Sequence, residues 1–477
     1  MNLLARVIAE PPLEFGDGGL HIDPRMGLID HGPLQPVLGN RVSVGVIGTA
    51  ETVEGFIQFI ERCKTGIEGK RRDLTNLFPA FPGIGNRNPF RCSFEADADA
   101  RRVIPKRDVD RIVALQKQSS AVEAAAELFS EQAMSMLEGS SKPDVIVIAL
   151  PVDLIVRLVN AKWTHDDDDE DDVELNFRDL LKARMLSLRV PSQIVWPTLW
   201  DDRAKIPRKL KDTLRQVQDP ATRAWNLLNA LFYKAGKAPW RLPRHEGDYK
   251  ASYLGIGFYK DITGQKLLTS TAQMFDERGR GLILRGARAR TDKGDRHPYL
   301  QRNDAYELLT RSVKAYRAHH GHAPARLVIL KTSRFETGEA DGINDAADEL
   351  QIDRRDLLWV SESCHATLVR EGDYPPLRGS YLQLGRDGLL FSRGSVPYYR
   401  TYPGLRVPRP LLLRPHHCDT ALHELAREML ALTKMNWNST QFDQNLPIPI
   451  RAARQVGRVL KHVSYSQKDQ SDYRFYT

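Results

Sequence analysis

In the first half of the chain, short apolar runs alternate with longer segments in which apolar residues recur every three or four positions. The short runs have the length and composition of buried strands, and the longer segments have the period of amphipathic helices. The predicted strands are residues 42–47, 144–150 and 193–196. The predicted helices are residues 53–60, 108–138, 176–189 and 208–234. This alternation predicts an α/β domain with a parallel, Rossmann-like sheet.

The turn after the first predicted strand contains glycine. Such a turn at a helix N-terminus can bind the phosphate of a dinucleotide through backbone N–H groups. Here only Gly45 and Gly48 are present, and no third glycine follows. The pattern therefore favours a structural turn over a dinucleotide site.

The second half has a different order of elements. Strands are predicted at 253–259, 267–275 and 282–287, followed by a helix at 299–318 and a further strand at 326–330. Three consecutive strands, a helix and a parallel strand are the order of an RNase H-like sheet, so we predict that fold. The predicted organisation is an extended N-terminal arm (1–40), a Rossmann-like domain (41–245) and an RNase H-like domain (246–477).

The last predicted helix combines a basic and an apolar face. Arg451, Arg454, Arg458 and Lys461 are spaced by three, four and three residues, which places them on one stripe of a helix. The apolar positions, which cover much of the remaining surface, are Val456, Val459, Leu460 and Val463. The stripe is interpreted either as a solvated helix face or as a surface that follows a polyanion.

Composition favours the polyanion. Lys and Arg number 69 against 61 acidic residues, which gives a formal charge of +8 and suits a nucleic-acid partner. No apolar run approaches membrane-spanning length, and the first six residues are too short for a signal sequence, so we expect a cytoplasmic protein without a membrane partner. The four cysteines show no CxxC spacing, and neither a zinc site nor a disulfide framework is indicated.

Four polar residues of the first domain form a candidate anion site. Arg178 and Lys182 are four residues apart on one predicted helix, and Gln193 lies at the start of the next strand. Lys234 ends the following helix. Two cations, an amide and a further lysine can neutralise and hydrogen-bond a terminal phosphate. Spacing alone favours a structural interpretation, with two surface cations, a strand-edge glutamine and a lysine at the negative end of a helix dipole.

This series resembles a known motif. Arg178-x3-Lys182-x10-Gln193, followed by Lys234 in a Tyr-Lys-Ala-Gly segment, is similar to the guide 5′-phosphate motif of Argonaute MID domains. The N-terminal arm and the ending that starts at Asn438 resemble short prokaryotic Argonautes, which consist of MID and PIWI domains without N and PAZ domains. The resemblance implies a MID domain over 41–245 and a PIWI domain over 246–477.

The same resemblance implies that the PIWI domain has lost nuclease activity. A catalytic PIWI domain binds two metal ions with four ligands, and the corresponding positions here are Gly257, Thr332 and Arg454, the last within the pattern Pro-x-Pro-x-x-x-Ala at 447–453. No glutamate that could act as the fourth ligand occurs between Arg278 and Tyr306. A guanidinium in place of a ligand would repel the ions. We therefore expect a non-enzymatic protein whose channel residues are Arg451, Arg454, Arg458 and Lys461.

By resemblance, such proteins hold a small 5′-phosphorylated guide RNA and recognise complementary single-stranded DNA. They act with a second protein, an APAZ region fused to a TIR, sirtuin-like or nuclease effector, and protect prokaryotes from plasmids and phage. The complex is a heterodimer that can oligomerise on target binding. The family often places a C-terminal carboxylate, here that of Thr477, near the guide phosphate, sometimes with Mg²⁺. The position one turn before Lys234, which can assist that ion, is Ala230 and has no ligand atom.

Two alternatives stay open at this point. The first is an active RNase H-type nuclease with unconventional ligands, for which Asp276, Asp292 and Asp295 are the acids that could be recruited. The second is a scaffold for a partner protein that binds nucleic acid without specificity.

Overall fold

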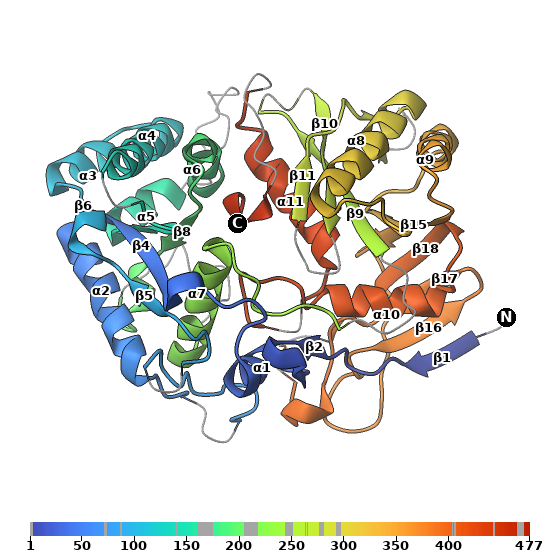
Figure 1. Cartoon of the computed structure of the whole chain (residues 1–477), viewed down its shortest axis with the longest axis horizontal. Helices are drawn as coiled ribbons and strands as arrows, with labels where there is room; N and C mark the ends of the chain where they lie inside the picture. Colours follow the sequence, from blue (N-terminus) through green and yellow to red (C-terminus); the bar gives the residue numbers. More distant parts are fainter. Residues whose placement is uncertain are drawn as a thin grey trace.

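A computed structural model of the chain describes most of its residues. These are 3–70, 74–85, 88–139, 142–159, 175–204, 218–243, 251–262, 264, 266–275, 281–291, 297–402, 404, 407–441, 444–464 and 472–477. Within them the structure has two main sheets, one in each half of the chain, with helices packed on both (Figure 1).

The first sheet is parallel, as predicted. In space its strands follow the order β5-β4-β7-β8, and β6 also pairs with β4. Their bounds are β4 (Arg41–Gly48), β5 (Ser93–Glu95), β6 (Arg101–Val103), β7 (Val145–Ala149) and β8 (Ser192–Val195). Every residue of β7 is buried, because helices cover both faces of the sheet. The Rossmann-like prediction for the first half is confirmed.

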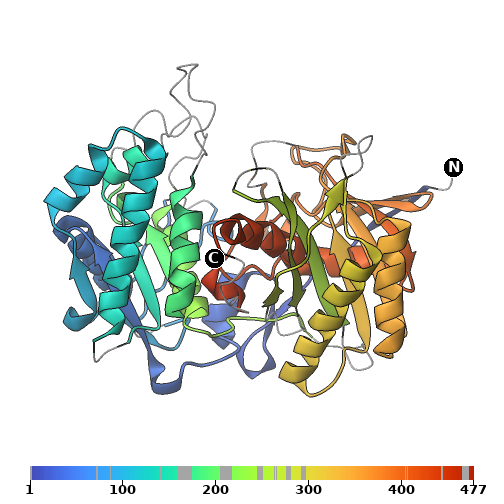
Figure 2. The same ribbon diagram turned by 90° about the horizontal axis from the view of Figure 1, so that it is seen from above.

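Six helices surround this sheet in the described part of the chain. They are α2 (Ala50–Thr65), α3 (Lys106–Val113), α4 (Gln118–Leu137), α5 (Val152–Val159), α6 (Phe177–Met185) and α7 (Pro220–Lys234). Figure 2 shows the helices on either side of the strands. The single helix predicted over 108–138 is wrong, since it consists of α3 and α4 with a break between them. The polar residues 116–120 interrupt the apolar stripe, so each segment packs its own face.

The predicted helix over 208–234 begins later than expected. α7 starts at Pro220, and the side chain of Asp219 caps it by accepting a hydrogen bond from the Thr222 N–H at 3.2 Å. Proline at the first helical position fits this start, because its fixed φ suits a helix and it has no N–H to satisfy. Residues 205–217 lie outside the described part.

The second sheet has nine strands in the order β1-β16-β17-β18-β15-β14-β9-β10-β11. Their bounds are β1 (Leu3–Val7), β9 (Ala251–Lys260), β10 (Leu267–Phe275), β11 (Gly281–Leu284), β14 (Arg326–Lys331), β15 (Arg354–Ser361), β16 (Ser380–Leu384), β17 (Asp387–Leu390) and β18 (Leu411–Cys418). β9, β10 and β11 form an antiparallel meander, and β14 pairs parallel with both β9 and β15. This is the predicted RNase H-like order, with four strands (β15 to β18) that the sequence pattern did not reveal.

Helices cover both faces of the second sheet. α8 (Arg302–His320) and α9 (Thr337–Glu349) pack on one face, where Leu254 and Ile329 belong to their core. α11 (Ile448–Leu460) packs on the opposite face, and α10 (Leu422–Leu432) packs on β16, β17 and β18. α11 approaches β9 closely because Gly255 has no side chain: a Cβ there would lie 2.2 Å from the carbonyl oxygen of Pro449.

The N-terminal arm is more structured than the predicted extended segment. It contains β2 (Leu13–Glu14), β3 (Leu20–His21) and the helix α1 (Pro24–His31), while β1 joins the far edge of the second sheet. Arg25 forms a buried ion pair with Asp23 at 2.7 Å, and Tyr399 donates to the same carboxylate at 2.6 Å. Burial of these polar groups is tolerated because each is hydrogen-bonded. The arm therefore contacts both halves of the chain.

A short ribbon of β12 (Arg290–Thr291) and β13 (Pro298–Tyr299) precedes α8. All four cysteines are free thiols. None of the helices in the described ranges is both long and apolar enough to cross a membrane.

Candidate functional site

The site begins on α6, where Arg178 and Lys182 lie one turn apart. Asn176 caps this helix by accepting a hydrogen bond from the Asp179 N–H at 3.2 Å, which fixes where the first turn starts. The apolar residues that anchor α6 in the core are Phe177, Leu181 and Met185. Lys182 lies on the same helix but is almost completely buried, with 2% of its surface exposed. The helix therefore carries one cation inward and leaves Arg178 nearer the surface.

Lys182 and Lys234 meet at the start of β8. Both ammonium groups donate to the carbonyl oxygen of Ser192, Lys234 at 2.9 Å and Lys182 at a shorter distance. Lys234 also donates to the Oε1 atom of Gln193 at 2.6 Å. Residues from α6, β8 and α7 thus converge, as the motif predicted, and Gln193 completes the group.

The two buried lysines have no carboxylate in direct contact, although the more distant Asp179 partly offsets the charge of Lys182. In the described part of the chain neither ammonium forms an ion pair, and Lys234 is only 1% exposed. Burial lowers the pKa of Lys182 well below its usual value, and the positive charges of Lys234 and Arg178 lower it further. Burial also lowers the pKa of Lys234, again with a contribution from Arg178. An anion placed between these groups would relieve both effects.

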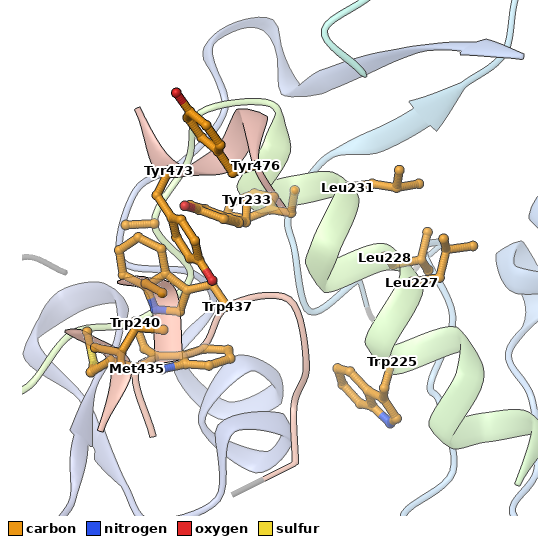
Figure 3. Packing of buried hydrophobic residues seen from close by; sticks show 14 of the residues in the cluster. Trp225, Leu227, Leu228, Leu231, Tyr233, Trp240, Met435, Trp437, Tyr473 and Tyr476 are labelled. Atoms are coloured by element: carbon orange, nitrogen blue, oxygen red, sulfur yellow. The ribbon is translucent and has the colours of Figure 1, made fainter. Parts of the chain in front are cut away.

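Arg178 connects this pocket to the C-terminal segment. Its guanidinium donates to the carbonyl oxygen of Tyr476 at 3.1 Å and to Asp179 at 2.8 Å. Arg474, in the same segment, donates to the carbonyl oxygen of Lys234 at 3.4 Å. Figure 3 shows Tyr473 and Tyr476 packed beside the end of α7 at Tyr233. Residues 472–477 therefore form one wall of the pocket, the region in which the resemblance places the C-terminal residue Thr477.

The basic stripe predicted on the last helix is present on α11. Its apolar partners Val456, Val459 and Leu460 are buried. Arg458 is exposed and lies 4.0 Å from the Asp179 carboxylate on α6, while Arg454 pairs with Glu362 beyond β15 at 2.5 Å. Arg451 donates to Gln444. α11 lies between α6 and the strands β9 to β11 (Figure 1), so the stripe runs from one half of the chain to the other.

The positions that correspond to nuclease ligands lie on or next to the adjacent strands β9 and β14 and on α11. Ile256 of β9 and Lys331 of β14 are partners in the parallel pairing of these strands. Gly257 and Thr332 are the residues that directly follow them. Side chains alternate along strands, so Thr332 and Gly257 face α11 together with Leu330 and Gly255. Arg454 extends from α11 toward Glu362. The structure brings the three positions to the same side of the sheet, and none of them carries a carboxylate or imidazole.

Among the described residues around the pocket, the oxygen ligand suited to Mg²⁺ is the C-terminal carboxylate of Thr477, since Mg²⁺ uses one or two carboxylates and completes its coordination with waters and substrate phosphates. The Ser192 carbonyl already accepts from two ammonium groups, and Ala230 supplies no donor. Thr477 is buried, and its hydroxyl donates to the carbonyl oxygen of Arg474 at 3.1 Å. No cluster of three or more His, Cys, Asp or Glu suited to a metal is found among the described residues. Asp276, Asp292 and Asp295 lie outside them.

Sequence reasoning missed two polar residues beside the site. Asp179 is nearly buried between Arg178 and Arg458, although its position next to Arg178 is visible in the sequence. His462, directly after α11, has two ring nitrogens that are buried without a hydrogen-bond partner. Burial lowers the pKa of His462 to about 4, with Lys461 adding to the shift and Asp179 opposing it. The surroundings of Asp179 and His462 both arise from the packing of α11 against α6, which the sequence pattern does not show.

Comparison with known proteins agrees with this geometry. No protein-family model matches the chain. In sequence, the chain is similar to the protein named argonaute from Thermus thermophilus, at 25% identity over 311 residues, which cover 61% of this chain and 42% of that protein.

Similarity to solved structures extends over nearly the whole chain. Clostridium butyricum Argonaute bound to a guide DNA and a 19-mer target DNA aligns with a TM-score of 0.67 and 15% identity, over 97% of this chain and 53% of that one. Drosophila Piwi aligns with a TM-score of 0.61 and 12% identity, over 99% and 56%. A. aeolicus Argonaute aligns with a TM-score of 0.58 and 14% identity, over 98% and 54%. The chain spans about half the length of these proteins. It has the mixed α/β fold of the MID and PIWI domains of Argonaute proteins.

Proposed function

We propose that this chain is an Argonaute-family protein that holds a small 5′-phosphorylated guide RNA and uses it to recognise complementary single-stranded DNA. The observation that carries the proposal is the pair of buried ammonium groups of Lys182 and Lys234, which share the Ser192 carbonyl and have no ion pair in the described structure. A terminal phosphate supplies the missing negative charge and accepts hydrogen bonds from both. Gln193 and Arg178 complete its recognition.

The basic stripe on α11 extends this contact along the nucleic-acid backbone. Arg458 lies toward the phosphate pocket, 4.0 Å from Asp179, and Arg454 pairs with Glu362 after β15. Backbone phosphates attract such cations irrespective of sequence, so base pairing between guide and target can supply the specificity. The Clostridium butyricum protein, with the same fold, binds a guide and a target together.

We propose further that the chain does not cleave its target. Gly257, Thr332 and Arg454 occupy the positions of nuclease ligands, and a two-metal mechanism needs carboxylate or imidazole groups there. The Arg454 guanidinium pairs with Glu362 and has no lone pair to offer a metal ion. On this proposal the signal of target recognition passes to a partner, an APAZ-effector protein with TIR, sirtuin-like or nuclease activity. We place the protein in prokaryotic defence in the cytoplasm.

We propose that the phosphate contact made by the described residues does not require Mg²⁺. The two ammonium groups can neutralise a phosphate directly, whereas Ala230 and the Ser192 carbonyl offer no coordination sphere. By resemblance, the ligand that would bind Mg²⁺ here is the C-terminal carboxylate of Thr477. Guide affinity measured with Mg²⁺ and with EDTA tests this point, and equal affinities are expected.

The central experiment measures binding of a short RNA with and without a 5′ phosphate, by fluorescence anisotropy at fixed salt. The wild-type chain is expected to bind the phosphorylated RNA more tightly, and Lys182→Gln and Lys234→Gln to lose that preference. Lys314→Gln, on the exposed face of α8, is the matched control. Equal binding of both RNAs by the wild type would identify a nonspecific scaffold instead.

The partner is tested by purifying the chain with the product of the neighbouring gene. Sequencing of the bound nucleic acid is expected to show short RNAs with 5′ phosphates. Addition of single-stranded DNA complementary to the guide is expected to switch on the partner's activity, and scrambled DNA is the control. Bulk fragments without 5′ phosphates would contradict guide loading.

A further inference from the structure

The nine-stranded sheet ends in an open edge at β1 (Leu3–Val7). One side of β1 pairs with β16, and no strand in the described part of the chain pairs with its other side. Figure 1 shows β1 at the outer margin of the molecule, beside β16. The opposite end of the sheet is covered, because Leu282 of β11 forms a bridge with Asp472 of the C-terminal segment. An uncovered edge presents N–H and C=O groups to which another strand can bond.

A hydrogen bond at the end of β1 shows which of its residues bond to β16. The Ile8 N–H donates to the carbonyl oxygen of Gly379, directly before β16, at 2.8 Å. Residues of an antiparallel strand alternate between those that bond to this neighbour and those that point away from it. Arg6 therefore bonds to β16, whereas Ala5 and Val7 direct their N–H and C=O groups to the open edge.

The hydrogen bonds of β16 give the same assignment. The Phe391 N–H, directly after β17, donates to the carbonyl oxygen of Ser380 at 2.9 Å, so Ser380 bonds toward β17. Its neighbour Tyr381 therefore bonds toward β1, where its partner is Arg6. Val7 is the partner of Ser380, which bonds away from β1, so the backbone groups of Val7 point to the open edge.

In the described structure, β1 lacks the features that usually protect an edge strand, such as lysine, proline or a bulge. Its sequence, Leu3-Leu-Ala-Arg-Val7, contains neither Lys nor Pro, and its register with β16 is regular. Leu4 and Val7 are apolar, yet 39% and 61% of their surfaces are exposed, and Ala5 is exposed as well. Exposed apolar residues on an open edge favour pairing with a further strand.

The sequence of β1 is complementary to itself in antiparallel pairing. A two-fold axis at Ala5 places Ala5 opposite its own copy and Val7 opposite Leu3 of the second chain. These are the residues whose backbone points outward, so each pair can exchange both of its hydrogen bonds. Arg6 then lies opposite Leu4, and the two guanidinium groups do not face each other. Like charges directly opposite would destabilise the pairing.

We propose that two copies of the chain associate through β1 and join their nine-stranded sheets into one. The occupant of the edge is β1 of the second copy, because it matches the outward backbone groups along the whole strand and opposes no like charges. β1 lies at the other end of the sheet from β9 and β10, on which α11 packs. The contact therefore leaves the phosphate pocket free and does not rest on the proposed binding of a guide.

Sedimentation equilibrium of the full chain without nucleic acid tests the association. A contact confined to one pair of strands is expected to be populated between about 1 and 100 μM. With rising concentration, the wild type should approach twice the chain mass of 54.1 kDa. Ala5→Lys and Ala5→Glu each place two like charges opposite each other at the axis, and each should weaken association about fivefold. Both variants are expected to fold, because Ala5 is exposed.

An equimolar mixture of Ala5→Lys and Ala5→Glu is the decisive measurement. Opposite charges then face each other at the axis, so the mixture should associate at least as tightly as the wild type, although neither variant does so alone. Leu38→Lys is the matched control, since Leu38 is an apolar residue outside β1 with 90% of its surface exposed. This control should leave the association unchanged.

Three outcomes would overturn the proposal: the wild type stays monomeric over the whole range, both Ala5 variants associate like the wild type, or their mixture associates no better than either variant alone. The second outcome would place the contact on another surface, and the third would exclude the register centred on Ala5. If the wild type alone is monomeric but binds the product of the neighbouring gene, and neither Ala5 variant does, the edge belongs to that partner instead.

Discussion

Lys182 and Lys234 donate hydrogen bonds to one and the same carbonyl oxygen, that of Ser192. Two buried like charges with one neutral acceptor repel each other more strongly than they would in water, because the interior screens charge weakly. The folded chain therefore holds an arrangement that a dianionic group stabilises. This relationship is the basis of the first three predictions.

Substituting Lys182 with glutamine is expected to lower affinity for a 5′-phosphorylated RNA by about 10- to 100-fold, the value of one hydrogen bond to a charged group. Affinity for the same RNA with a 5′ hydroxyl should change little, because the lost contact is to the phosphate. Fluorescence anisotropy with both RNAs measures the difference. An equal loss for both RNAs would mean that the substitution perturbs the fold or the channel.

Guide affinity is expected to fall as the pH rises through the alkaline range. The ordinary pKa of lysine is about 10.4, and burial lowers the pKa values of Lys182 and Lys234 in the free pocket. A bound phosphate favours the charged forms and raises both pKa values again, so binding takes up protons between the lowered values and the raised ones. Calorimetry in two buffers of different ionisation enthalpy measures this uptake, which Lys182→Met should reduce.

The same groups affect stability with the opposite sign. In the pH window between the lowered pKa values and about 10.4, the unfolded chain binds more protons than the folded one. The free energy of unfolding of the guide-free chain should therefore gain a contribution that rises with pH across this window. Urea unfolding of the wild type and of Lys182→Met at several pH values checks the sign, and parallel curves would refute it.

The purified chain, loaded with guide, is expected to leave complementary DNA uncut in Mg²⁺ or Mn²⁺. Gly257, Thr332 and Arg454 supply no metal ligands, and Arg454→Ala should not restore cleavage because the other ligands would still be missing. Denaturing gels of labelled target after long incubation provide the measurement. Cutting that requires the guide and is lost in Asp292→Asn would revive the nuclease alternative.

Next to Thr332, the structure contains a buried ion pair between Lys331 and Glu339, both with 0% side-chain exposure. Burial lowers the pKa of Lys331 and raises the pKa of Glu339, so the interior disfavours both charges despite their contact. Lys331→Met should destabilise the fold by about 3–5 kcal/mol, because it leaves a buried carboxylate unpaired.

The double variant Lys331→Met, Glu339→Gln is expected to recover part of this loss. The glutamine keeps an oxygen for the Leu300 N–H, which donates to Glu339 at 3.0 Å, and carries no charge. Urea unfolding of both variants and the wild type gives the free energies of unfolding. A double variant that is less stable than Lys331→Met would show that the ion pair is not the reason for the loss.

The elements that the sequence predicted best are those with unambiguous periodicity. β7 and β14 lie close to their predicted positions because continuous apolar runs of strand length are hard to mistake. The strands β15 to β18 escaped prediction because their burial pattern is mixed: β18 includes Arg414, Pro415 and two histidines. Its pairing with β15 is a tertiary contact that overrides local preference.

The candidate site, like the fold, was predicted only in part from the sequence. The spacing of Arg178 and Lys182 revealed the cations, since residues four apart share a helix face. It did not reveal that Lys182 is buried or that Ser192 supplies the common acceptor, because both depend on how α6 and α7 pack against β8. The resemblance placed the C-terminal residue Thr477 near the phosphate, but spacing could not predict the contacts of residues 472–477 with α6 and α7, because these contacts arise from the tertiary fold.

The pairing of β1 with β16 has a consequence for biosynthesis. Leu3 is opposite Leu384, so the strand that leaves the ribosome among the first elements finds its partner only after most of the chain has been translated. The parallel sheet of the first half can close in the meantime, because its strands are complete by Val195. Until then β1 presents unpaired backbone N–H and C=O groups. The nascent protein therefore passes through a long interval with an unprotected edge strand, during which a chaperone is the natural protector of its first residues.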